Sequence, residues 1–184
     1  MKQIGMLIAV AVLTLSGCGS EGPTPAEKAA ASKSAAAEQA AKDRAEAAAK
    51  KKAKQTAVFK ECSEVTRGLD DKLSELNSRL SVGMQFDDYT RRVGAVQVAY
   101  DKLIKEAKAR GGLSDQCVDK VALPLQTALN AYNTAYNVWN DCNSDYNCSI
   151  NEGDAKRKIQ GAWAKASAKI EKSETALAAL QPAA

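Results

Sequence analysis

The sequence predicts an all-α protein, an up-down-up-down four-helix bundle preceded by an Ala/Lys-rich helical stalk. Three observations lead to this prediction. The 184 residues include only 11 Gly and 4 Pro, too few turn residues for an all-β domain. Residues 58–180 carry four apolar stripes with the spacing of helices packed side by side. Residues 26–57 consist mostly of strong helix formers and contain no large apolar residue.

Residues 1–17 have the composition of a signal peptide. A short positive start is followed by 12 mostly apolar residues, from Ile4 to Leu15. A signal-peptide core has about 7–15 such residues, whereas a spanning helix needs about 20. The run ends in Leu15-Ser16-Gly17-Cys18, which resembles the lipobox of bacterial lipoproteins: Leu, two small residues and Cys. The alternative is an ordinary secretory signal followed by a chance cysteine.

The resemblance implies cleavage before Cys18 and lipidation of that cysteine, palmitate included. The chain is then expected to be a lipid-anchored protein of the cell envelope, with its bulk on the non-cytoplasmic side of the cell membrane or outer membrane. Two or more acyl chains give stable anchoring, because each buried methylene contributes about 0.8 kcal/mol. Gly19 stands where the family's inner-membrane retention signal in Gram-negative bacteria is Asp, which favours the outer membrane in such an organism.

Residues 18–57 are predicted to be a lipid anchor followed by a helical spacer, here called the stalk. Fifteen of residues 26–57 are Ala, and this tract carries eight basic and four acidic side chains, whereas residues 58–184 are neutral. The whole net charge of +4 therefore belongs to the stalk. It is interpreted as a solvated, semi-rigid rod. The alternative is attraction of Lys50-Lys51-Lys52 and Lys54 to anionic lipid or cell-wall polymer.

Residues 58–184 are predicted to form the bundle domain, which is long enough to bury a core of its own. Each of four segments carries an apolar residue every three or four positions, as in a coiled coil. These residues are Val58, Cys62, Val65, Leu69, Leu73, Leu76 and Leu80; Phe86, Tyr89, Val93, Val96, Tyr100, Leu103 and Ala107; Leu125, Ala128, Leu129, Tyr132, Ala135, Tyr136 and Trp139; and Ile159, Trp163, Ala166, Ile170, Ser173, Leu177 and Leu180.

Helix-breaking residues separate the four segments. Ser81-Val82-Gly83 and Gly111-Gly112 are expected to end the first and second helices. Pro124 is expected in the first turn of the third helix. Residues 140–153 form a polar turn region before the fourth helix, near Asp154. Short links between helices of similar length predict antiparallel neighbours.

Four cysteines remain after Cys18, an even number that suggests two disulfides in an exported chain. In the predicted topology, Cys62 and Cys117 lie at one end of the bundle. Cys142 and Cys148 lie at the other end. A 24-residue helix spans roughly 36 Å, but the Cα atoms of a disulfide approach within about 7 Å. The topology therefore predicts the pairs 62–117 and 142–148. A thiolate metal or redox site is the alternative, although no CxxC is present.

Two further sets of residues are candidate binding sites. Asp141, Asn143, Asp145 and Glu152 resemble EF-hand calcium ligands at loop positions 1, 3, 5 and 12. Tyr146 stands where that loop needs Gly, and the cysteines favour a disulfide-closed connector instead. The second set is a candidate ligand groove, for which aromatic core packing is the alternative. Its residues are Tyr132, Tyr136, Trp139 and Trp163.

The function classes are narrowed mainly by what the sequence lacks. It has no histidine, which excludes Ser-His-Asp catalysis, Cys-His catalysis and His-based zinc sites. The adjacent carboxylates Asp70-Asp71 and Asp87-Asp88 point in different directions on a helix, so neither pair is expected to be a catalytic dyad. No cofactor and no nucleic-acid partner is expected. The prediction is a non-enzymatic structural or protein-interaction module with a protein or cell-wall partner. The alternative is an accessory lipoprotein that binds a small ligand.

Overall fold

The computed structural model describes residues 25–182, and every regular element in this range is helical. The helices are α1 (Pro25–Ser81), α2 (Phe86–Ala109), the single turn α3 (Asp115–Cys117), the π-helical turn η1 (Val118–Ala122), α4 (Leu123–Ser144) and α5 (Gly153–Leu180). The predicted all-α helical bundle is confirmed. The predicted signal peptide 1–17 and the predicted lipidation site Cys18 lie outside the described residues.

The chain divides into two units, residues 1–46 and residues 47–184. In the first unit, α1 begins at Pro25, and the side chains described there, Lys33 and residues 36–46, are all exposed. An ion pair between Lys42 and Glu38 (2.7 Å) supports the exposed helix. Residues 47–54 of the second unit are also exposed, and its core begins at Cys62, with Val58 and Phe59 packed against it.

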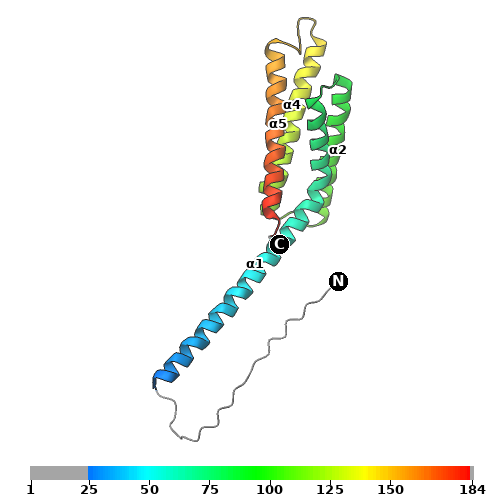
Figure 1. Cartoon of the computed structure of the whole chain (residues 1–184). Helices are drawn as coiled ribbons and strands as arrows, with labels where there is room; N and C mark the ends of the chain where they lie inside the picture. The colour runs from blue at the N-terminus through cyan, green and yellow to red at the C-terminus, as the bar shows by residue number, and fades with distance from the viewer. Residues whose placement is uncertain (1–24, 183–184) are drawn as a thin grey trace, which may run out of the picture. The chain divides into compact units, whose positions relative to one another are not determined.

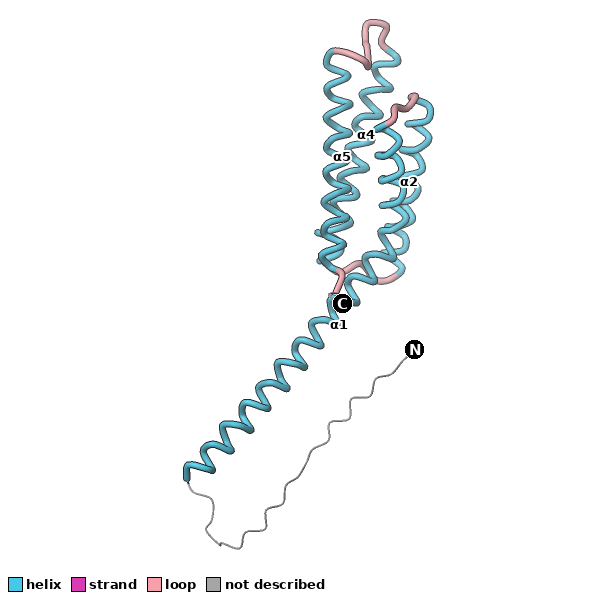
Figure 2. The backbone as a smooth tube through the Cα atoms, viewed as in Figure 1, coloured by secondary structure: helices cyan, strands magenta, loops and turns pink. Residues whose placement is uncertain are grey.

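In the second unit, residues 47–81 of α1 run antiparallel to α2, and α4 runs antiparallel to α5 (Figure 1). Figure 2 shows the α1–α2 and α4–α5 connections together at one end, here called the hairpin end. The connection from α2, residues 110–114, lies at the opposite end, here called the return end. The order is therefore up, down, up, down.

The predicted heptad stripes supply the core. All four helices contribute fully buried residues, so each stripe faces the common interior. The buried residues include Leu69, Leu73, Leu76, Tyr89, Val96, Leu125, Ala128, Tyr132, Ala135 and Ala166. Ser173 is the polar member of its stripe, and its Oγ donates a hydrogen bond to the carbonyl oxygen of Val121 (3.2 Å). That bond satisfies the buried hydroxyl group.

The second helix ends at glycine, as predicted. Gly111 and Gly112 both have positive φ, +83° and +109°, which is unstrained for residues without a Cβ. The amide of Gly112 donates to the carbonyl oxygen of Ala107 (2.9 Å), and that of Gly111 donates to Lys108 (3.1 Å). These two bonds form a Schellman motif, which satisfies carbonyl groups left free at the helix end.

Pro124 lies in the first turn of α4, as predicted. Sequence analysis did not predict the helical structure that precedes it, because the chain is already helical from Asp115 through α3 and η1. A proline there has no N–H to donate and its ring clashes with the preceding turn. The π-helical turn η1 lies directly before Leu123 and Pro124, where its wider winding makes room for the ring. Sequence periodicity does not predict such a turn.

Candidate functional site

The residues of the predicted aromatic groove lie in the core of the bundle. Tyr132 and Trp139 are buried, and Tyr136 and Trp163 are half-buried. Two aromatic residues of α2 join them, Phe86 and Tyr89. The closest rings are Phe86–Trp139 and Tyr89–Trp139 at 5.5 Å and Phe86–Tyr136 at 5.7 Å, followed by Trp139–Trp163 at 5.9 Å. We call these six residues the aromatic cluster.

Hydrogen bonds link three members of the aromatic cluster, Tyr89, Tyr132 and Trp163. The indole Nε1 of Trp163 donates to the hydroxyl of Tyr89 (3.1 Å), which donates to the carbonyl oxygen of Tyr132 (2.9 Å). The hydroxyl of Tyr132 donates to Oδ1 of Asn77 on α1 (3.1 Å). Burial raises the pKa of both tyrosines, so both remain protonated donors. The cluster is a packed polar–aromatic core and not an open groove.

A hollow of about 220 Å³ lies beside the cluster at the hairpin end. Trp139 and Trp163 line it together with apolar residues of the α1–α2 turn, and Lys156 and Gln160 supply its polar edge. Tyr132 and Tyr136 do not line it. Sites for drug-sized ligands usually have about 300–1,000 Å³, so this hollow admits only a small molecule.

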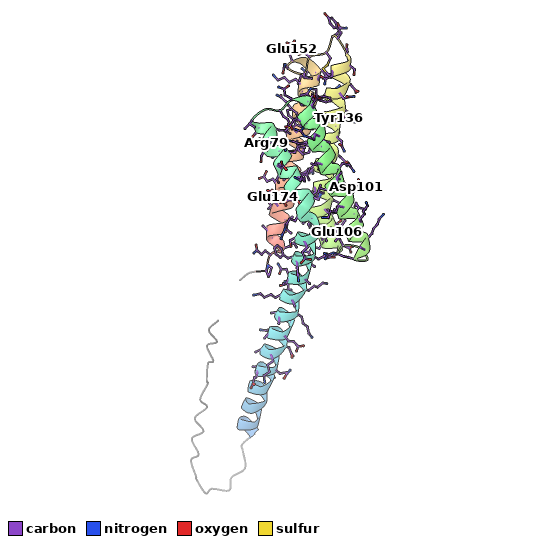
Figure 3. All side chains as sticks on the ribbon, turned by 90° about the vertical axis from the view of Figure 1, so that its right-hand side faces the viewer. Arg79, Asp101, Glu106, Tyr136, Glu152 and Glu174 are labelled. Carbon is purple, nitrogen blue, oxygen red and sulfur yellow. A yellow bond between two sulfur atoms is a disulfide. The ribbon has the colours of Figure 1, made fainter. Side chains whose placement is uncertain are left out.

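The predicted calcium residues do not form a ligand loop. Asp141 and Asn143 lie within the last turn of α4, where the chain is still helical. Asp145 Oδ1 accepts a hydrogen bond from the amide of Asn147 (2.9 Å), which closes a local turn. Glu152 is exposed just before α5, at the hairpin end (Figure 3). Among residues 25–182, no three Cys, Asp or Glu side chains come together to hold a metal ion.

The cysteines have the pairing expected from the topology. Cys62 on α1 is bonded to Cys117 on α3, with Cα atoms 5.4 Å apart, and closes a sequence separation of 55 residues at the return end. Cys142 is bonded to Cys148, with Cα atoms 5.1 Å apart, and closes the short connector at the hairpin end. The second bond narrows the segment that the calcium prediction required to be an open loop.

Asp88, one of the adjacent aspartates Asp87-Asp88, forms ion pairs with two arginines of its own helix. Asp88 pairs with Arg91 and with Arg92, whose Nε is 3.1 Å from Oδ2. Hydrogen bonds from Arg92 and Arg91 and their charges hold the pKa of Asp88 below its usual value. Arg92 also forms an ion pair with Glu75 of α1 (2.7 Å), so it links α2 to α1.

Asp70 is the one strongly perturbed carboxyl group of the described chain. It is half-buried, and its Oδ1 has no hydrogen-bond partner there. Burial, the negative charge of Glu174 on α5 and that of Asp71 raise its pKa from 3.8 to about 6. Ser74 donates a hydrogen bond to Glu174 (3.3 Å), so the seam between α1 and α5 carries two facing carboxyl groups.

A larger hollow of about 660 Å³ lies along α1 and α2. Its apolar lining includes Gly68, Ala95, Val98 and Ala99, and charged side chains also line it. Val98 is 68% exposed, and nothing lies within 4 Å of where a Cβ on Gly68 would be. One signal of this surface is present in the sequence, because Val98 is a large apolar residue outside the heptad stripe of its helix.

No helix in the described part of the chain is long and apolar enough to cross a membrane. No protein-family model matches the chain, and neither a curated protein nor a solved structure matches it.

Proposed function

We propose that the protein is a lipid-anchored component of a bacterial cell envelope, which presents its helical bundle as a non-enzymatic interaction module. The observation that carries the proposal is the tetrapeptide Leu15-Ser16-Gly17-Cys18 after an apolar core of signal-peptide length. Acyl chains on Cys18 anchor the chain, and the Ala/Lys-rich stalk is a spacer between that anchor and the bundle.

The interior of the bundle supports an interaction role over a catalytic one. Its aromatic side chains pack against one another, and the polar atoms of Tyr89, Tyr132 and Trp163 are hydrogen-bonded within the protein. The carboxyl group of Asp88 is held in ion pairs with neighbouring arginines. A partner is therefore expected to bind the outer surfaces of the helices, where the larger hollow lies.

Replacement of the cysteine tests the anchor. Cys18→Ala removes the sulfur that carries the first lipid, so we expect unprocessed precursor and no lipid-modified N-terminus. Ser16→Ala keeps a small residue within the lipobox and is the matched control, in which processing continues. Mass spectrometry of the mature N-terminus distinguishes the two variants. A mature chain that starts at any residue other than a lipidated Cys18 would contradict the proposal.

A second candidate function is the binding of a small amphipathic ligand in the hollow beside Trp139 and Trp163. Both indoles line the hollow, and Lys156 supplies a positive charge at it. Anilinonaphthalene sulfonate, a small aromatic anion, is a suitable probe, because its binding changes tryptophan fluorescence. Binding that Lys156→Gln weakens and that Lys158→Gln leaves unchanged would favour this function. Identical binding by both variants would exclude this hollow as the site.

A further inference from the structure

The surface between α1 and α2 combines a projection and a recess in one hollow. Val98 on α2 is 68% exposed, although it is a large apolar side chain. Gly68 on α1 lines the same hollow, and its missing side chain leaves open space. A surface that carries both a knob and a hole for it is complementary to a second copy of itself.

The charges around the hollow are balanced. Three of the charged residues that line it are acidic and three are basic. They are Glu64, Asp71 and Glu106, and Arg67, Lys72 and Lys102. A partner of strong single-sign charge, such as a nucleic acid or an anionic polymer, would meet as much repulsion as attraction here. A second copy meets opposite charges instead, because the patch carries both signs at different positions.

We propose that this surface, lined by Gly68 and Val98, is where two copies of the chain pair about a two-fold axis parallel to the helices. The inference rests on the proposed function, since it names the partner of the interaction module. In such a pair, α1 of each copy faces α2 of the other. Val98 of each copy then enters the recess at Gly68 of the other, as a symmetric interface requires.

The same arrangement pairs charges across the axis. Glu64 on α1 and Lys102 on α2 line one hollow, so Glu64 of each copy faces Lys102 of the other. Within one chain these groups are held only at the surface, Glu64 by Arg110 (3.3 Å) and Lys102 by Glu106 (3.7 Å). A parallel pair also places the return ends of both bundles on the same side, which suits two chains anchored in one membrane.

Charge exchange tests the pairing. Two copies of the full chain with different affinity tags are expressed together, extracted in detergent and purified through one tag. Glu64→Lys alone and Lys102→Glu alone each place like charges in both halves of a symmetric pair, so co-purification is expected to fall. The Glu64→Lys copy together with the Lys102→Glu copy restores opposite charges in both halves, so co-purification is expected to recover.

Filling the recess is the second test. Gly68→Leu occupies the space that Val98 needs, and its open surroundings allow the chain to fold. Gly161→Leu is the matched control, because Gly161 is also a helical glycine with open space around it, but on α5. We expect Gly68→Leu to abolish pairing and Gly161→Leu to leave it unchanged. In analytical ultracentrifugation, the Gly68→Leu variant should therefore have the mass of a single chain. If Gly68→Leu fails to fold, the charge-exchanged pair decides.

Three results would overturn the proposal. The first is a chain that is monomeric in the membrane extract. The second is pairing that is equally strong with and without Gly68→Leu. The third is a different protein bound in place of the second copy. Fractionation of the same cells keeps the anchor separate: a lipid-anchored monomer contradicts only the pairing, whereas a dimer without lipid on Cys18 contradicts only the proposed anchor.

Discussion

The hydroxyl group of Tyr89 on α2 donates a hydrogen bond to the main-chain carbonyl oxygen of Tyr132 on α4, at 2.9 Å, and both residues are fully buried. The same hydroxyl accepts a hydrogen bond from Trp163 on α5. One oxygen atom therefore joins three helices inside the core. The apolar stripe of each helix determines which faces pack together. The hydrogen bond adds a second requirement, because it forms only when α2 and α4 have one particular shift along their axes relative to each other.

Tyr89→Phe keeps the ring and removes this oxygen. The N–H of the half-buried Trp163 then loses its acceptor, so we expect the free energy of unfolding to fall by about 1–3 kcal/mol. Tyr146→Phe is the matched control, because the side chain of Tyr146 is fully exposed. Urea denaturation measures the difference. Equal stability of the two variants would mean that the three-helix bond contributes nothing.

Acidification is expected to stabilise the seam between α1 and α5. The pKa of Asp70 is about 6 in the folded protein and near 3.8 when unfolded, so the folded state holds the proton more tightly. This contribution to stability is fully present below about pH 4 and is lost as the pH rises through 6. Asp70→Asn should therefore raise the melting temperature at pH 7 and flatten its dependence between pH 4 and 7.

The matched control variant for the seam is Asp101→Asn, which makes the same substitution at an exposed aspartate on α2. Glu174→Gln removes the facing charge and should shift the transition toward lower pH. A difference in melting temperature between Asp70→Asn and the unaltered protein that is the same at pH 4 and at pH 7 would contradict the raised pKa.

The two disulfides are expected to differ in their effect on stability. In the chain-entropy estimate, the loop of 55 residues closed by Cys62–Cys117 stabilises the fold by about 4 kcal/mol, and the short loop closed by Cys142–Cys148 by about 2 kcal/mol. Paired Cys→Ala variants measure each contribution by denaturation. Peptide mapping without reduction should recover the same two pairs, and a 62–142 link would contradict the helix order.

Removal of the exposed N-terminal tract should leave the bundle intact. A chain that begins at Ala57 keeps every buried residue, because the core begins at Cys62, so we expect a melting temperature close to that of the full mature chain. The peptide 26–57 alone should be only partly helical, since Ala-rich helices without packing are marginal in water. Circular dichroism measures both. A large loss of stability in the shortened chain would mean that the stalk packs against the bundle.

Much of the fold could be predicted, because the spacing of apolar residues and the positions of helix-breaking residues reflect the local preference of the chain for helix. Leu69, Leu73 and Leu76 are buried where the first stripe places them, and the second helix ends at Ala109, two residues before the predicted Gly111. The cysteine pairing followed from helix order and length. These inferences need only the chain's own spacing, which is fixed by helical geometry.

The candidate sites were harder to predict, because they depend on what lies beside each residue. The aromatic residues at Tyr132 and Trp139 have the same helical spacing in a groove and in a core. Only the contacts from Phe86 and Tyr89 decide between the two. The raised pKa of Asp70 likewise depends on Glu174. That residue is 104 positions away in the sequence, but it lies on the facing helix. Asp141 and Asn143 matched a ligand pattern in sequence while the backbone remained helical.

The bond between Cys62 and Cys117 also determines how the protein responds to mechanical load. When the two ends of the chain are pulled apart, tension passes from α1 directly through the two sulfur atoms to α3. The whole of α2 lies inside the closed loop and carries no load. While the bond is intact, the 55 residues between the two cysteines cannot extend. The length of the fully extended chain is therefore shorter by roughly 190 Å, at about 3.3–3.6 Å per residue. In single-molecule stretching, reduction of the Cys62–Cys117 bond should therefore add this length to the unfolded chain, and the protein with this bond intact should never reach it.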